Sequence, residues 1–119
     1  MNWYLAKIVF QILCGEGNHT AQFDEQLRLI QAGTKQQAFE KAAELGRREQ
    51  EVFININQEK VHWNFVNVSE IYRISDLIDG AELYSRIEEK EDGAGYQRIV
   101  HRKAELIQST NTLELLQLA

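Results

Sequence analysis

The chain has 119 residues, of which 44% are hydrophobic and 26% charged, proportions typical of a folded globular domain rather than a disordered or fibrous chain. Its formal net charge of −5 argues against a nucleic-acid partner, because phosphate binding depends on a dense basic surface. The longest apolar stretch, residues 3–13, is too short for a membrane span of about 20 residues and contains Lys7 and Gln11. The single cysteine, Cys14, favours a reducing cytoplasm, so we expect a cytoplasmic protein with no membrane segment.

Residues 3–13 predict a strand, because one set of alternating side chains is apolar throughout. The set expected to face the core is Tyr4, Ala6, Ile8, Phe10 and Ile12. After a glycine-containing loop, residues 23–32 predict a second strand. Its more apolar set, expected to point inward, is Phe23, Leu27 and Leu29. The set expected to point outward is Asp24, Gln26 and Arg28.

A helix is predicted to follow, because Thr34 and Gln37 form a capping box at its start. Apolar residues then recur at helical spacing from residue 38 onward. Gly46 costs about 1 kcal/mol relative to alanine in a helix, so we expect the helix to end or bend there. Alternating isoleucine and asparagine in residues 54–56, followed by a turn-like segment 57–60, is compatible with a short extra strand.

Residues 61–74 form the longest strand candidate. Its apolar side changes between Phe65 and Val66, which indicates a β-bulge or a strand covered on both faces. A turn at Asp79 and Gly80 then leads to a predicted strand over residues 81–88. A second amphipathic helix is predicted to begin near Tyr96 and to continue past residue 103.

The predicted order ββαββα indicates an α+β protein. We expect a two-layer α/β sandwich, with a four-stranded antiparallel sheet and both helices on one face. The first and third strands are the most apolar, which favours the order 2-1-3-4; the alternative is 1-2-4-3, a circularly permuted ferredoxin-like arrangement. Residues 1–110 are expected to form one domain and residues 111–119 a leucine-rich C-terminal tail.

Four segments resemble those of a known family. They are WYLAK at 3–7, FDEQLRLI at 23–30, QAFEKA at 37–42 and DGAELYSRI at 79–87. In this order and spacing the chain is similar to a family of small uncharacterised bacterial proteins, the domain of unknown function 4288. The resemblance implies a bacterial cytoplasmic protein with the strand-strand-helix-strand-strand order, and it implies no reaction.

Metal binding is weakly supported by the sequence. Cys14 and His19 form one Cys-x4-His pair, and the remaining histidines, His62 and His101, lie on separate elements. Because a zinc site needs three or four suitably spaced ligands, we predict no metal and no cofactor. A nucleophilic Cys14 needs a base that the sequence does not position, so we interpret the thiol as structural or incidental.

Glu25 is the most informative single residue. With the facing expected for residues 23–32, its carboxylate points toward the helix layer, where a charge is tolerated only when it is paired. The partners we consider are Arg73, Arg98 and Lys103. The alternative is a solvated carboxylate near the strand end or an ordinary structural ion pair.

One basic patch follows the acidic run 88–92. It consists of Arg98, His101, Arg102 and Lys103. This patch could hold an anion, or it could be a solvated helix face that pairs with the acidic loop. The candidate binding residues are Glu25, Tyr84, Arg86, Arg98 and His101, and no residue is assigned a catalytic role.

These observations favour a small binding or interaction protein that acts as a homodimer. The first strand places four apolar side chains on the face away from the helices, and the tail adds four leucines. The first set is Trp3, Leu5, Val9 and Leu13. One alternative is an immunity or antitoxin-like protein that covers a basic partner. Another is a small-molecule enzyme that uses Glu25, Tyr84 and Arg86.

Overall fold

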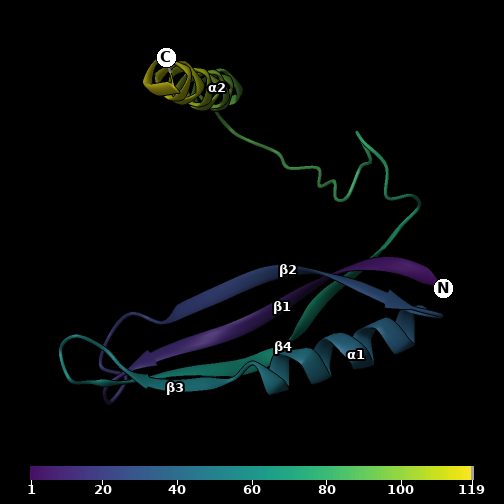
Figure 1. Ribbon diagram of the computed structural model, residues 1–119, viewed down its shortest axis with the longest axis vertical. Coiled ribbons are helices and arrows are strands. Elements are labelled where there is room, and N and C mark those ends of the chain that lie inside the picture. Colours follow the sequence, from purple (N-terminus) through teal and green to yellow (C-terminus); the bar gives the residue numbers. More distant parts are fainter. Residues whose placement is uncertain (119) are drawn as a thin grey trace. The chain divides into compact units, whose positions relative to one another are not determined.

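The computed structural model describes the backbone of residues 1–118 and the side chains of residues 1–109. Its elements are β1 (Asn2–Cys14), β2 (Gln22–Ala32), α1 (Lys35–Arg48), β3 (Glu51–Ile54), β4 (Lys60–Ile74) and α2 (Gly93–Leu118) (Figure 1). The chain divides into two compact units, residues 1–85 with the sheet and α1, and residues 86–119 with α2. The predicted α+β class is therefore confirmed.

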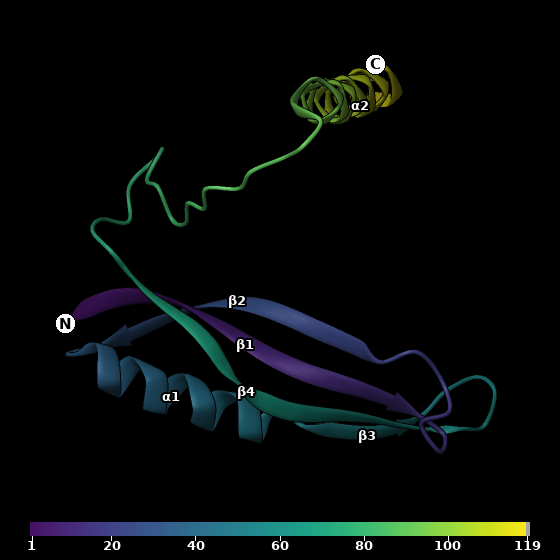
Figure 2. The same ribbon diagram turned by 180° about the vertical axis from the view of Figure 1, so that it is seen from behind.

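The four strands form one antiparallel sheet in the order β2-β1-β4-β3. The long strands β1 and β4 occupy the centre, as the 2-1-3-4 prediction placed them. The alternative order, with residues 3–13 at an edge, is wrong. In both ribbon views α1 runs along one face of this sheet (Figures 1 and 2).

The second edge of the sheet differs from the prediction. Residues 81–88 form no strand, and the short segment β3 takes the edge position beside β4. A local turn explains this difference. The side-chain oxygen of Asn55, Oδ1, accepts hydrogen bonds from the backbone amides of Asn57 and Glu59. This turn closes a β3–β4 hairpin at little cost in chain entropy, whereas residues 81–88 would have to return over a longer loop.

β4 contains two irregularities, which confirms the predicted bulge. In its pairing with β1, Val66 and Ser69 have no opposite residue. Each extra residue shifts the alternation by one position, so Phe65, Val68 and Ile71 all contact the same core. The bulges keep the apolar side chains of a 15-residue strand on one side despite the irregular sequence pattern.

α1 lies close to the sheet because its contact face is made of small residues. Ala38, Ala42 and Gly46 recur every four positions and are buried. A Cβ at Gly46 would lie 2.4 Å from the Phe65 ring, so glycine is needed there and the helix continues past it to Arg48. The predicted N-cap is also present, since Thr34 Oγ1 accepts from the Gln37 amide. The Gln37 side chain accepts from the amide of Gly33, one residue before the Thr34 amide that a capping box would use.

The facing predicted for β1 is confirmed, and that predicted for β2 is wrong. Tyr4, Ala6, Ile8 and Phe10 of β1 are buried under α1. Because opposite residues of paired strands share a face, the pairs Ile8 with Gln26 and Phe10 with Asp24 place the even-numbered side chains of β2 on that side too. The odd-numbered set of β2, which includes Leu27, therefore points away from α1.

The second unit confirms the predicted second helix, since α2 runs from Gly93 to Leu118. Residues 1–85 are all described, and within them α1 is the one helix that packs on the sheet. The expectation of two helices on one face is therefore not supported. The predicted boundary between residues 110 and 111 stays a prediction, and the side chains of the expected tail lie outside those described. No helix in the described part of the chain is both long and apolar enough to cross a membrane.

Candidate functional site

The side of the sheet opposite α1, which we call the open face, carries a large apolar surface. It is formed by the odd-numbered residues of β1 and β2 and by the residues of β4 paired with them. On β2 this face presents Phe23, Leu27 and Leu29, each between 49% and 54% exposed. Beside them on β1 lie the partly buried side chains of Trp3 and Val9. Apolar side chains so exposed and so close together are characteristic of an interaction surface.

A charged group occupies the middle of the open face. Lys7 of β1 is the central cation, with its Nζ 3.3 Å from Glu70 Oε2 on β4 and 3.8 Å from Glu25 Oε2 on β2. The strand register explains this meeting, because Lys7 pairs directly with Glu70 and lies diagonally across from Glu25. Oε2 of Glu70 is shielded from solvent and accepts no aligned hydrogen bond, so its contact with Lys7 is mainly an ion pair.

Two side chains at this site, Lys7 and Tyr72, have shifted pKa values. The pKa of Lys7 is raised, first by its side-chain contact with Glu70 and further by the charge of Glu25, while desolvation acts in the opposite direction. Desolvation also raises the pKa of Tyr72, and the nearby Glu70 carboxylate adds to this effect. At neutral pH the lysine therefore stays an ammonium and the tyrosine stays a phenol. Lys7 therefore contributes an ion-pairing ammonium, and Tyr72 contributes a hydroxyl that can donate a hydrogen bond.

Tyr84 joins this surface from the segment after β4. Its ring packs edge-to-face on that of Tyr72, with 5.2 Å between the ring centres. Tyr72 is itself opposite Leu5 in the β1–β4 pairing, so both tyrosines adjoin the charged cluster. Two residues that the sequence singles out, Glu25 and Tyr84, thus lie on the same face of the first unit.

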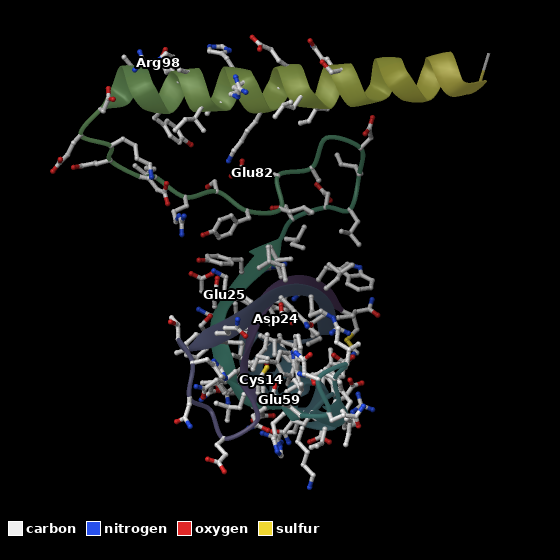
Figure 3. The ribbon with its side chains drawn as sticks, turned by 90° about the vertical axis from the view of Figure 1, so that its left-hand side faces the viewer. Cys14, Asp24, Glu25, Glu59, Glu82 and Arg98 are labelled. Carbon is white, nitrogen blue, oxygen red and sulfur yellow. The ribbon has the colours of Figure 1, made fainter. Side chains whose placement is uncertain are left out.

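The predicted orientation of Glu25 is wrong. The carboxylate points away from α1, and 61% of its side chain is exposed (Figure 3). Its ion-pair partner is Lys7 on the neighbouring strand, and Arg73 instead donates to Asn2. The error follows from the inverted facing of β2, since Asp24 and not Glu25 points toward the helix side. Asp24 accepts hydrogen bonds there from Gln26 and Trp63.

The remaining candidates belong to the second unit. Arg86 forms an ion pair with Glu88, and Lys90 contacts the same carboxylate at 3.1 Å. Hydrogen bonding from Lys90, followed by the charge of Arg86, lowers the pKa of Glu88. Arg98 and His101 are exposed on α2.

A hollow of about 620 Å³ lies beside this part of α2, with walls of mixed charge. It is lined by Lys90, Glu91, Asp92, Gly95, Tyr96, Arg98, Ile99 and Arg102. Arg98 therefore shares a hollow with acidic residues of the preceding loop, and the solvated alternative for the basic patch matches this mixture.

Both ring nitrogens of His19 contact the backbone of the loop between β1 and β2. Its Nε2 accepts from the Cys14 amide at 3.0 Å, and its Nδ1 lies 2.8 Å from the Thr20 carbonyl oxygen, to which it donates in this tautomer. Both ring nitrogens are engaged by the backbone, so His19 holds the loop rather than activating the Cys14 thiol. Cys14 and Glu59 lie near each other at this end of the sheet (Figure 3), and both line a hollow of about 490 Å³. Among the side chains described, no three His, Cys, Asp or Glu residues cluster as metal ligands.

Sequence reasoning does not find Lys7, Glu70 and Tyr72 as members of this site. One signal was present, since Lys7 interrupts an otherwise apolar set made of Trp3, Leu5 and Val9. Glu70 could not be placed opposite Lys7 without knowing that β4 contains two bulges between Phe65 and Glu70.

Comparison with known proteins agrees with this division of the chain. A family model described as a domain of unknown function (DUF4288) matches residues 3–85. The chain belongs to this family. The predicted resemblance is therefore confirmed, and the matched segment ends where the first compact unit ends. No curated protein and no solved structure matches the chain. The family description names no activity, so a function for this member has to be argued from its surface.

Proposed function

We propose that this member of the family is a small binding protein that works as a homodimer, with the open faces of two copies packed together. The observation that carries the proposal is the apolar surface of β2. Phe23, Leu27 and Leu29 are each about half exposed although they lie on a long strand of the sheet. Covering such a surface with a matching one removes apolar area from water, which is the main favourable term in association.

A second copy suits this face because the charges at its centre are of both signs. Lys7 lies between Glu25 and Glu70, so a copy related by a two-fold axis can place its ammonium near the partner's carboxylates. An open face of one sign would repel its own copy. The apolar residues on β2 would then pack as the two inner faces of a sheet-on-sheet interface.

The same proposal includes two further expectations, one about the layers of the assembly and one about the location of the protein in the cell. In this proposal the first unit forms a two-layer sandwich of the sheet and α1, and the sheet of the second copy adds a third layer. A cytoplasmic location fits the single cysteine, because a reducing compartment keeps Cys14 a thiol.

The test is the mass in solution, measured by light scattering after gel filtration. The mass measured for the wild-type protein should be twice the 13.8 kDa of one chain. Leu27→Asp should give the single-chain mass, since it places a carboxylate in the apolar part of the interface, where burying a charge is unfavourable. Leu27 is 51% exposed, so this variant should still fold, which circular dichroism checks.

The matched control is Ile56→Asp. Ile56 is 95% exposed in the β3–β4 turn, away from the open face, and the same chemical change there should leave the dimer intact. A wild-type mass of 13.8 kDa at all concentrations up to hundreds of micromolar would overturn the proposal. Equal dissociation of both variants would also overturn the placement of the interface.

A further inference from the structure

The side of the sheet that carries α1 is only partly covered by it. α1 ends at Arg48, and β3 continues along the remaining part of the sheet (Figure 2). Past the helix end lies a hollow of about 330 Å³, which we call the end cavity. It is lined by Phe10, Gln26, Glu49, Glu51, Phe53 and Trp63. Every one of these residues belongs to the first unit and none belongs to the open face.

Three of the lining side chains are aromatic. Phe53 of β3 and Trp63 of β4 stack with 6.4 Å between ring centres and 30° between ring planes. Phe10 of β1 lies deeper and is almost fully buried. The indole of Trp63 is held in place because its Nε1–H donates to Asp24 Oδ2 at 3.3 Å. The cavity therefore has a fixed aromatic wall on β3 and β4.

The polar lining is acidic. Glu49 is the C-cap residue of α1, where the helix dipole is negative, and Glu51 begins β3. Both terminal nitrogens of Arg28 donate to the Glu49 carboxylate, at 2.6 and 3.0 Å, so the charge of this cation is engaged by Glu49. Glu51 has no ion-pair partner among residues 1–109, so its negative charge is uncompensated.

We propose that the end cavity binds a small organic cation, an alkylammonium or guanidinium group, against the stacked rings of Phe53 and Trp63 and beside the carboxylate of Glu51. An aromatic ring attracts a cation over its face, and an unpaired carboxylate adds a charge of the required sign. An anion would be repelled by Glu51 and by the helix end. The volume of about 330 Å³ falls at the lower end of the range for small-molecule sites, which fits a single such group.

The cation could come from two sources with the same chemistry, a free small amine or the side chain of a lysine or arginine in another protein. Titration with n-butylammonium represents the first source, and Nα-acetyl-lysine methylamide represents the second. n-Butanol is the neutral control, since it has the same alkyl length and no charge.

The readout is the NMR signal of the Trp63 Nε1–H group, with the Trp3 indole as an internal reference on the opposite face. We expect n-butylammonium to shift the Trp63 signal saturably and to leave the Trp3 signal unchanged. Tighter binding of the blocked lysine would support the proposal with a protein side chain as the source. Binding of n-butylammonium alone would support it with a free amine. Equal shifts from n-butanol, or no saturable shift with either cation, would overturn it.

Glu51→Gln removes the charge from an exposed position on a short edge strand, so the variant should fold. We expect it to weaken cation binding by at least about fivefold, the effect of losing one charge-assisted contact. Glu40→Gln, on the exposed side of α1, is the matched control and should leave the affinity unchanged. Equal affinities of the two variants would show that the carboxylate does not hold the cation and would overturn the proposed site.

Discussion

The two faces of the sheet are built on different principles. Under α1 the contact depends on small residues, because Ala38, Ala42 and Gly46 let the helix backbone approach the strands closely. The open face has no helix packed on it within residues 1–85, although Leu5 is buried there and Tyr84 packs on Tyr72. It carries larger apolar side chains, about half exposed on β2, beside the ion pairs of Lys7. The comparison shows that the more apolar side of a strand need not be its core side. Close packing, and not the number of large apolar residues, distinguishes the core face of this sheet.

β2 shows this difference most clearly. Its core side contributes Asp24, Gln26 and Arg28, which are partly buried and satisfied by hydrogen bonds or by Glu49. Its open side contributes three large apolar side chains that are about half exposed, those of Phe23, Leu27 and Leu29. One strand can therefore hold a polar network against the helix end and an apolar surface against a partner.

The largest expected effect separates two phenylalanines on opposite faces. Phe10→Ala should lower the free energy of unfolding by about 3–5 kcal/mol, because it removes a fully buried ring and leaves a cavity. Phe23→Ala should lower it by about 0.5 kcal/mol or less when both are made in the monomeric Leu27→Asp background. Urea unfolding measures both values. Similar losses would show that the open face contributes to the core of a single copy.

The next effect tests the close approach of α1. Gly46→Ala should raise helix propensity by about 1 kcal/mol, yet the added methyl group would meet the Phe65 ring. Overpacking of this kind costs about 1–3 kcal/mol, so the variant should be less stable than wild type by up to about 2 kcal/mol. Gly93→Ala is the control, because nothing lies within 4 Å of a Cβ there. A gain in thermal stability from Gly46→Ala would contradict the close packing.

A smaller effect is expected for the ion pair at the helix end. Both partners are about a third exposed, so Arg28→Gln should cost less than about 1 kcal/mol at pH 7. Hydrogen bonding from Arg28 lowers the pKa of Glu49 in the folded state. The contribution of this pair is therefore present above the unfolded glutamate pKa, near 4.3, and is lost as the pH falls through the lower folded value.

Urea melts at pH 7 and pH 3 measure this pH dependence. The difference between wild type and Arg28→Gln should shrink at the lower pH. Arg47→Gln, which breaks the more exposed pair with Glu44, should have a smaller effect at both values. A loss from Arg28→Gln that is independent of pH would mean that its packing and not its ion pair stabilises the fold.

The smallest effect is expected on the open face. Glu25→Gln should change the free energy of unfolding by less than about 0.5 kcal/mol, because the carboxylate is 61% exposed and its contact with Lys7 is 3.8 Å long. Glu40→Gln on the exposed side of α1 should behave in the same way. A clear destabilisation by Glu25→Gln alone, seen in urea melts, would show that the open-face ion pairs support the fold.

Local patterns predict much of this fold. The facing of β1, the N-cap at Thr34 and the bulge in β4 each depend on a few neighbouring residues, and each is confirmed. The facing of β2 is not predictable in this way, because Phe23 and Leu27 look like core residues until the pairing with β1 is known. The role of Gly46 depends in the same way on Phe65, which is distant in sequence.

The candidate site is predictable to a lesser degree. The sequence singles out Glu25 and Tyr84, but their environment is set by Lys7, Glu70 and Tyr72 on other strands. The strand predicted at 81–88 fails for a similar reason. Its alternating pattern is real, but a strand also needs a free sheet edge, and the edge of β4 is occupied by β3, which is closer in sequence.

The two bulges of β4 also determine where this chain can change in length. Removing one residue from a regular strand exchanges the two faces for every position beyond it. Removing Val66 or Ser69 instead deletes a residue that has no partner on β1, and the neighbouring residues keep their sides. These two positions are therefore where we expect this long central strand to tolerate a deletion while the same core and the same open face are retained.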